Sequence, residues 1–397
     1  MANTNLARAL PSKYEELDQA IADKIAKDAE RNDAEIRFPR ENLEALAEIG
    51  WAGVLTEPQY GGLGFSHIDF AEASYRIGQA DASTGLVYVM HVGAVQTINL
   101  FGNHDQKERW LKAGGRFLLG TYSTSERASG GHWWYNFSEA SRDGSDYLVN
   151  AEKSFTTSSG KADYYVLQTR TPGAKDQTDI TFFIVNGKAP GITPGRWDAL
   201  GVRANHSGSI KYEGVKVPQR DRLGQEGQGK DIIYHGVSPV YLIGLGAVWE
   251  GVAKGALDAA TAHVTGFVHQ DKNKSLADYQ AIRQQLGEVK VLLESLRPWR
   301  NELAAKLDEL QRAGKPQGEI LIPLTEFKVH AAEVANKAAA AALTVTGGYG
   351  YRRGKLERLF RDARAAIAMG PSNTIAREWI GKVLVGQPLE LFYEGGE

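Results

Sequence analysis

The sequence predicts an α+β fold, in which a helical N-terminal domain and a C-terminal helical bundle flank a small antiparallel β-domain. Apolar residues recur with helical spacing up to about residue 117 and again from residue 229, whereas they alternate with polar residues between about residues 119 and 223. The 397 residues suffice for two or three domains with ample core. We expect the domains to span residues 1–118, 119–226 and 227–397.

The N-terminal part contains an amphipathic helix pattern. Leu43, Leu46 and Ile49 recur at i, i+3 and i+6 and form an apolar stripe, which Gly50 would end. The Gly- and Pro-rich segment 56–64 follows and predicts a turn.

The central part contains segments with the alternation of strands, separated by Gly, Pro and Asp turns. These segments are Tyr147–Thr157, Asp163–Arg170, Ile180–Val185 and Ser209–Val217. The gaps between them are too short for the crossover helices of a doubly wound parallel sheet, so we expect an antiparallel one.

The C-terminal part returns to helix. The segment 238–263 carries four glycines that let helices approach closely, and the segments 278–313 and 320–343 predict two further long helical stretches. Gly347 and Gly348 follow an Ala-rich run. They either end a helix or bring bare backbone close to a phosphate-bearing ligand.

Composition excludes several function classes. Because the chain has no cysteine, disulfides and thiolate catalysis are absent, and the nine histidines show no metal-binding spacing. The net charge of −2 provides no attraction to nucleic acid. There is no run of about 18 apolar residues, and the N-terminus lacks the apolar core of a secretion signal. We therefore expect a cytoplasmic protein without a membrane span.

Motifs along the chain carry a family resemblance. They are Pro58-Gln-Tyr-Gly-Gly-Leu-Gly64, Ala82-Ser-Thr-Gly85, Phe101-Gly-Asn-His-Asp-Gln-Lys107, Gly347-Gly-Tyr-Gly-Tyr351 and Leu356-Glu-Arg-Leu-Phe-Arg-Asp-Ala-Arg364. From about Phe38 to Gly386 the chain resembles the acyl-CoA dehydrogenase family. The resemblance implies that family's fold, an FAD cofactor with FMN as the alternative, and an acyl-CoA substrate. It also implies a homotetramer and an electron partner, either an electron-transfer flavoprotein or a flavin reductase.

Two segments resemble the family's flavin-binding elements. The segment 122–131 matches the loop Thr-Glu-Pro-x-x-Gly-Ser-Asp, in which Thr124 is kept while Ser125, Glu126 and Gly130 replace Glu, Pro and Ser. The segment 153–158 matches a strand whose aromatic residue and Thr lie against the flavin ring, although a half-buried strand has the same pattern. The flavin-binding residues implied by the resemblance are Tyr122, Thr124, Phe155, Thr156, Thr157, Gln280, Gly347, Gly348 and Ser372.

The resemblance also points to a missing base. In the family, the residue eight positions after the Asp of Arg-Asp-Ala is usually the glutamate that removes the substrate's α-proton, and here that position is Gly370. Tyr241 stands at the alternative base position and His91 where related monooxygenases carry a His, so these two are the catalytic candidates. The substrate-binding residues implied are Ser129, Gly130, Tyr241, Met369 and Gly370.

Three functions are compatible with these residues. The leading one is flavin-dependent CH–CH oxidation of an acyl thioester, with a base that is not identified. The alternative is a flavin-dependent monooxygenase that uses O₂ and reduced flavin from a partner reductase and needs no α-proton base. The third, a catalytically silent binding protein, is disfavoured by the retained flavin-side residues.

Overall fold

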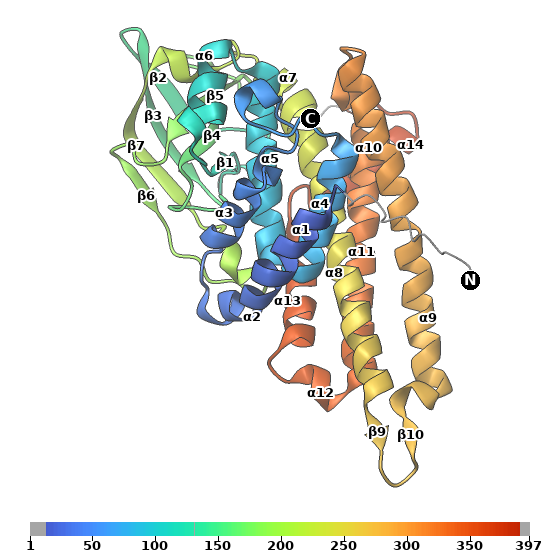
Figure 1. The fold of residues 1–397 in the computed structure, drawn as a ribbon. Helices are drawn as coiled ribbons and strands as arrows, with labels where there is room; N and C mark the ends of the chain where they lie inside the picture. Colours follow the sequence, from blue (N-terminus) through green and yellow to red (C-terminus); the bar gives the residue numbers. More distant parts are fainter. Residues whose placement is uncertain (1–12, 131, 390–397) are drawn as a thin grey trace, which may run out of the picture.

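The computed structural model describes residues 13–130 and 132–389. The N-terminal residues on which the expectation of no secretion signal rests lie outside this part. Helices at both ends of the chain pack around the long helix α8 (Ser238–Gly266), and a sheet lies on one side of them (Figure 1). The predicted α+β fold class is confirmed.

The N-terminal part is helical up to residue 115. Its α-helices are α1 (Glu15–Ala20), α2 (Ala26–Glu35), α3 (Arg40–Glu48), α4 (His67–Ala80), α5 (Ala82–Phe101) and α6 (His104–Lys107). Leu43 and Leu46 of the predicted stripe are fully buried. Ser66 and Asp81 fix the starts of α4 and α5 because their side chains accept hydrogen bonds from first-turn N–H groups.

The central part forms the sheet. Its strands are β1 (Gly120–Ser123), β2 (Glu139–Asp143), β3 (Asp146–Lys153), β4 (Tyr164–Arg170), β5 (Ile180–Asn186), β6 (Ile192–Pro194), β7 (Ile210–Val217) and β8 (Arg222–Leu223). The order is β6-β7-β3-β2-β4-β5-β8, with β1 beside β4. The pairings are antiparallel except β1–β4 and β2–β4. These parallel pairs need no crossover helix, because the β2–β3 hairpin and the loops around it supply the long connection.

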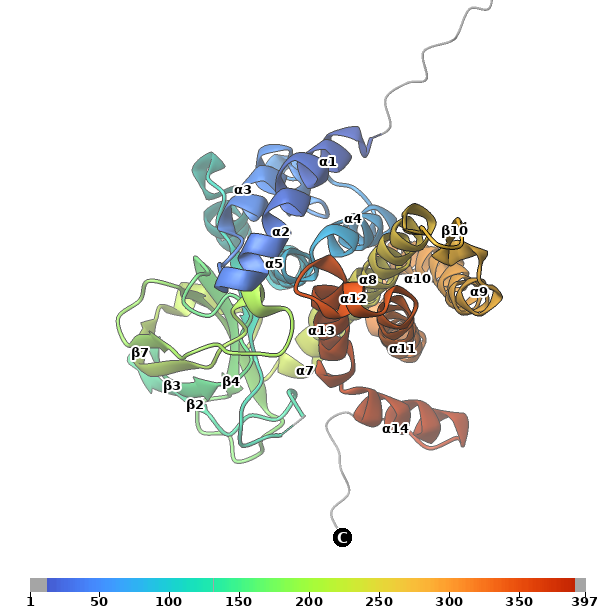
Figure 2. The same ribbon diagram turned by 90° about the horizontal axis from the view of Figure 1, so that it is seen from below.

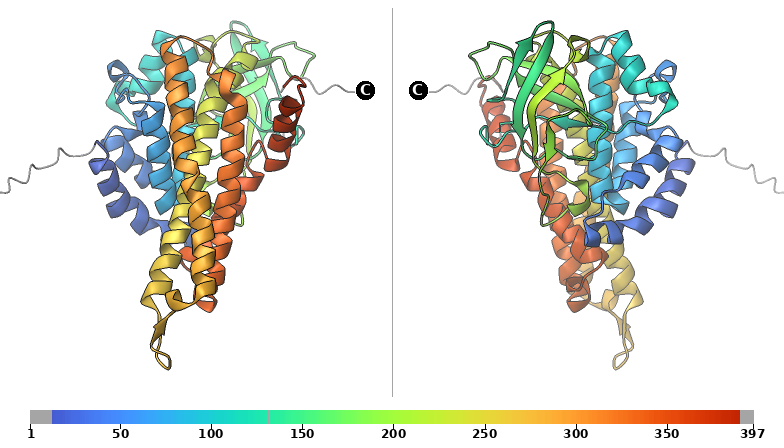
Figure 3. Two further views of the ribbon diagram at one scale, coloured as in Figure 1. Left: turned by 90° about the vertical axis from the view of Figure 1, so that its right-hand side faces the viewer. Right: turned by 90° about the vertical axis from the view of Figure 1, so that its left-hand side faces the viewer.

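The C-terminal part is a bundle of long and short helices. They are α7 (Gly229–Asp231), α8, α9 (Gln280–Glu294), α10 (Leu296–Arg312), α11 (Leu321–Thr346), α12 (Gly348–Tyr351), α13 (Lys355–Ala368) and α14 (Asn373–Leu384). The stretch predicted over 278–313 is divided near Ser295, because Pro298 has no N–H to donate to the carbonyl of Glu294. The hairpin β9 (Val268–His269) and β10 (Lys274–Ser275) extends beyond one end of the bundle (Figure 3).

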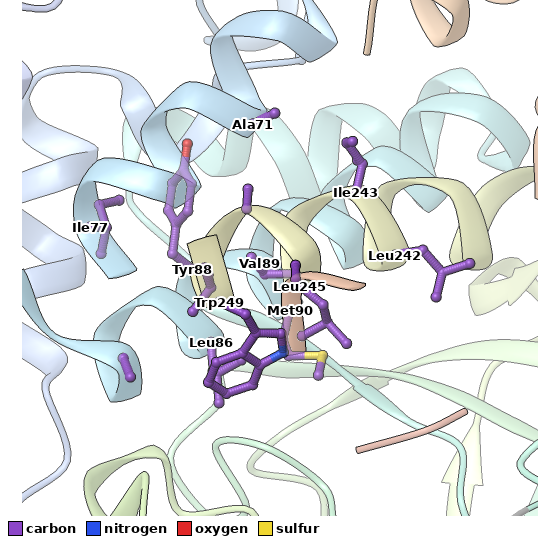
Figure 4. Close-up of a cluster of buried hydrophobic side chains, with 14 of the residues drawn as sticks. Ala71, Ile77, Leu86, Tyr88, Val89, Met90, Leu242, Ile243, Leu245 and Trp249 are labelled. Carbon is purple, nitrogen blue, oxygen red and sulfur yellow. The ribbon is translucent and has the colours of Figure 1, made fainter. Parts of the chain in front are cut away.

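The main core lies where α4, α5 and α8 meet. Tyr88, Val89 and Trp249 are fully buried there, among side chains from the three helices (Figure 4). The helices approach closely through glycine, because a β-carbon on Gly251 of α8 would lie 2.2 Å from the carbonyl oxygen of Tyr75 in α4. Such an approach is what the glycines of α8 predicted.

Two helical stretches, Ala82–Phe101 and Gly229–Gly266, are long and apolar enough to cross a membrane by length and composition alone. In each, 83% of the most apolar window is buried inside the protein. They are therefore interior helices of the fold, which need an apolar sequence on every face.

We propose that the domain boundaries lie near residues 118 and 226, in the connections that precede β1 and follow β8.

Candidate functional site

A cavity of about 470 Å³ lies between the sheet and the helices α5, α8 and α13. In the view along the bundle, α13 stands between the sheet and α11 (Figure 2). The cavity is lined by residues that the sequence resemblance singled out on separate segments: Tyr122, Thr124, Gly130, Phe155, Thr157, Tyr241, Met369, Gly370 and Ser372. The fold thus gathers most of the predicted site residues around one space.

Phe155 and Thr157 form the wall on the sheet side. The prediction that the strand continues to Thr157 is wrong. The strand β3 ends at Lys153, and Phe155 adopts the left-handed conformation with φ of 53°. This turn leaves Phe155 74% exposed, and the residue lines the cavity. Thr157 is buried behind it, with its hydroxyl 2.8 Å from that of Ser207. The turn therefore offers an apolar ring and a held hydroxyl to the cavity.

The remodelled loop after β1 is supported by a buried ion pair. Lys153 Nζ donates to Glu126 at 2.6 Å and to Asn136 Oδ1 at 2.6 Å, and both charged side chains are almost completely buried. Burial alone would raise the pKa of Glu126, but Lys153 and the N–H groups of Phe137 and Ser138 lower it. Glu126, in the place of the family's Pro, is thus a structural carboxylate that stays ionised and faces away from the cavity.

The loop between α13 and α14 forms the opposite wall. Lys328 of α11, which is fully buried, donates from Nζ to the carbonyl oxygens of Met369 and Pro371 at 3.1 and 2.9 Å. It also donates to Asn373 Oδ1 at 3.0 Å, and its burial lowers its pKa to about 7. Three bonds from one ammonium therefore fix the backbone that carries Gly370.

Trp133 lies beside Gly370 and was not found from the sequence. A β-carbon on Gly370 would lie 3.3 Å from Trp133 Cδ1 and 3.7 Å from Nε1. The indole lines the cavity, is 7% exposed, and its N–H has no hydrogen-bond partner in the described part of the chain. A Trp in an irregular loop carries no periodic signal, and it has no counterpart in the motif that identified this loop.

The other polar groups at the cavity include no carboxylate. Among the described residues that line it there is no Asp or Glu. Two arginines do line it: Arg361 lies 2.6 Å from both Asp33 and Glu357, and Arg364 donates to the neutral amide of Asn336 at 2.9 Å. Burial raises the pKa of Tyr241, so its hydroxyl remains protonated and can donate a hydrogen bond. The described part of the cavity wall thus offers hydrogen-bond donors, both neutral and cationic, but no carboxylate base.

Thr156, Ser129 and His91 do not line this cavity. The hydroxyl of Thr156 lies 3.2 Å from that of Ser123, and Ser129 Oγ donates to the carbonyl of Glu126 at 3.1 Å. Both side chains are buried, and these bonds hold them inside the protein. His91 Nδ1 accepts from the N–H of Gly120 at 3.1 Å, and burial lowers its pKa to about 4. His91 borders a separate cavity of about 650 Å³ beside the N-terminal helices. It therefore does not reach the cavity that holds the other predicted site residues.

Gln280, Gly347 and Gly348 also lie away from the cavity. Gln280 is the exposed first residue of α9, and the two glycines are exposed where α11 ends. Gly347 has φ of 55° and ends α11, as one of the two interpretations predicted. None of the three residues lines the cavity, so a flavin ring held there would not touch them within the same chain.

Family models match almost the whole chain. The model described as acyl-CoA dehydrogenase, N-terminal domain matches residues 14–114, the middle domain residues 121–215 and the C-terminal domain residues 243–385. Similar curated proteins include isobutyryl-CoA dehydrogenase of Dictyostelium discoideum, 28% identical with 90% of this chain and 84% of that protein covered. The short-chain specific acyl-CoA dehydrogenase of Clostridium acetobutylicum is 29% identical, with 83% and 85% covered.

Solved structures share the fold. Butyryl-CoA dehydrogenase from Megasphaera elsdenii is 26% identical with a TM-score of 0.86, covering 95% of this chain and 99% of that one. FMN-bound TdsC from Paenibacillus sp. A11-2 is 21% identical with a TM-score of 0.87, covering 96% and 99%. Together with the family models, these similarities show that the chain belongs to the acyl-CoA dehydrogenase family and is a flavin-dependent oxidoreductase.

Proposed function

We propose that the protein is a flavin-dependent monooxygenase that oxidises an apolar, uncharged substrate with O₂ and with reduced flavin from a partner reductase. One oxygen atom enters the substrate and the other leaves as water. The observation that carries this proposal is that no Asp or Glu lines the cavity in the described part of the chain. Removing a general base typically costs roughly 10²–10⁴ in rate, whereas oxygen insertion needs no α-proton abstraction.

The cavity residues fit a flavin ring. The exposed side chain of Phe155 offers an apolar face, and Thr124 and Thr157 also line the cavity. A bound flavin would supply the redox chemistry. Phe155 and Thr157 would hold and orient its ring, and Tyr241 and Met369 would confine the substrate and limit the access of water.

A second candidate function is CH–CH oxidation of an acyl thioester with FAD, using an electron-transfer flavoprotein as acceptor. It is favoured by the curated relatives, which include isobutyryl-CoA dehydrogenase and a short-chain specific acyl-CoA dehydrogenase. In that case the base must come from a group other than the residue at position 370. Tyr241, which stays protonated, suits an acid or a hydrogen-bond donor better than a base.

We also propose a homotetramer located in the cytoplasm. The region of Gly347 and Gly348 is exposed, and Tyr351 beside it is 87% exposed. Tyr349 stacks on His263 with ring centroids 3.9 Å apart and forms part of the same surface. An aromatic surface next to two bare glycines is suited to a second copy of the chain, whose flavin the glycines would then approach.

The experiment that separates the two functions uses the purified, flavin-loaded protein. Under anaerobic conditions, acyl-CoAs of increasing chain length are added and the flavin absorbance is recorded. The monooxygenase proposal predicts no bleaching by any thioester, and substrate-dependent O₂ consumption when reduced flavin is supplied. Bleaching by an acyl-CoA would instead establish the dehydrogenase.

A further inference from the structure

The indole N–H of Trp133 is a buried donor without an acceptor. The side chain is 7% exposed, and Nε1 has no hydrogen-bond partner among the described residues. A buried donor left unpaired costs about 1–3 kcal/mol, so such groups call for an explanation. Indole nitrogen can only donate, so its missing partner must be an acceptor.

The position of this N–H gives the explanation. The Cδ1–Nε1 edge of the ring faces Gly370, and both residues line the cavity. Because position 370 has no side chain, the N–H is open to whatever molecule occupies the space beside it. Trp134 provides a contrast: its Nε1 is also buried without a partner, but the ring packs on Trp379 with centroids 4.9 Å apart and does not line the cavity.

We propose that Trp133 is a specificity-determining residue whose Nε1–H binds an uncharged acceptor oxygen of the substrate, such as a carbonyl, next to Gly370. Two arginines also line the cavity, of which Arg361 is paired with Asp33 and Glu357, while Arg364 donates to Asn336. The indole N–H is a neutral donor, so a carbonyl, which loses little hydration on burial, suits it better than a carboxylate, whose burial costs far more. The proposal rests on the proposed function only in that this cavity holds the substrate.

The test compares two probes of equal shape, acetophenone and ethylbenzene, which differ only in the acceptor oxygen. Dissociation constants for both are measured by calorimetry on the purified flavin-loaded protein, on Trp133→Phe and on the matched control Trp134→Phe. We expect the preference for the ketone over the hydrocarbon to fall roughly 2- to 13-fold in Trp133→Phe, the equivalent of one hydrogen bond. Trp134→Phe should leave the preference unchanged.

Comparing the ratio of the two probes removes the effect of lost packing, which weakens both probes alike. If Trp133→Phe does not fold, Trp133→Leu is used in its place, because it also removes the donor. An unchanged preference in the folded variant, an equal fall in Trp134→Phe, or no binding of acetophenone up to its solubility limit would overturn the proposal. No turnover is measured, so the result does not depend on whether oxygenase activity or thioester oxidation is found.

Discussion

Gly370 and Trp133 lie side by side in the cavity wall, so closely that a β-carbon on Gly370 would lie 3.3 Å from Trp133 Cδ1. A β-carbon at position 370 would be accommodated if the indole ring of Trp133 moved by a few tenths of an ångström. The sequence resemblance predicts that the family's catalytic glutamate corresponds to this position. The indole edge occupies the direction in which a side chain at position 370 would start, so the absence of a side chain there and the presence of Trp133 form one local arrangement.

Gly370→Glu tests what this arrangement does. We expect oxygenase turnover to fall about tenfold or more, because burying a carboxylate against the indole of Trp133 in a largely apolar cavity costs over about 1.4 kcal/mol. We also expect no flavin reduction by acyl-CoAs. Gly370→Ala is the control, since it adds the β-carbon without the charge and should retain most of the turnover. Flavin reduction by an acyl-CoA in Gly370→Glu but not in the parent would reveal a vestigial dehydrogenase cavity and contradict the proposed function.

Phe155→Ala and Thr157→Val should weaken flavin binding without unfolding the protein. Loss of one hydrogen bond at Thr157 corresponds to about 0.5–1.5 kcal/mol, a rise in the flavin dissociation constant of roughly 2- to 13-fold. Phe155→Ala removes the exposed apolar ring at the cavity. Phe137→Ala is a matched control, since Phe137 is also exposed in the β-domain but does not line the cavity. Unchanged flavin occupancy in both variants would remove this turn from the site.

Glu126→Gln should destabilise the fold by about 3–5 kcal/mol, because it leaves the ammonium of Lys153 buried without its counter-charge. Glu139→Gln breaks an ion pair of the same sheet, with Arg170, that is partly exposed, so the expected cost is about 0–1 kcal/mol. Urea unfolding of the two variants and the parent measures both changes. Equal small effects would show that water reaches Lys153 in the folded protein.

The elements of the fold could be predicted because their signals are periodic. The burial of Leu43 and Leu46, the core strands and the long helices all follow from spacing that a single sequence displays. The ends of the strands could not be predicted from the sequence as well. The alternation through Phe155 continues past Lys153, but the left-handed turn at Phe155 depends on the surrounding loops and not on the local pattern.

The candidate site could be predicted only as far as the family motifs extend. They place Tyr122, Tyr241 and Gly370 at one cavity, although these residues are far apart in sequence. Motif position does not reveal the direction of a side chain, so His91 and Thr156 were expected at the site but face elsewhere. The contact between Trp133 and Gly370 and the anchoring by Lys328 join distant segments, and such contacts exist only in three dimensions.

The assembly proposal predicts a mass well above 43.4 kDa, the mass of one chain, in light scattering at micromolar concentration. Tyr351→Lys should shift the protein toward smaller species, because it places a charge at the exposed aromatic surface next to Gly347 and Gly348. Val291→Lys is a matched control at an exposed apolar residue of α9, and it should leave the mass unchanged. A parent protein that is monomeric would contradict the proposal.

Asp362 predicts a pH dependence of stability. Its carboxylate accepts a hydrogen bond from the N–H of Val202, a residue of the cavity wall, at 2.6 Å, and burial raises its pKa from 3.8 to about 7. A group whose pKa is raised by folding contributes stability below its unfolded pKa, and that contribution is lost as the pH rises toward its folded pKa. The parent should therefore lose stability through this group between about pH 4 and pH 7.

The variant Asp362→Asn tests this prediction. It keeps an acceptor for Val202 but does not titrate, so its stability relative to the parent should increase from about pH 5 to about pH 8. Asp362→Ala is the control, since it removes the acceptor and should be destabilising at both pH values. Urea unfolding at the two pH values measures the differences, and parallel profiles for the parent and Asp362→Asn would show that the carboxyl of Asp362 ionises as readily in the folded protein as in the unfolded chain.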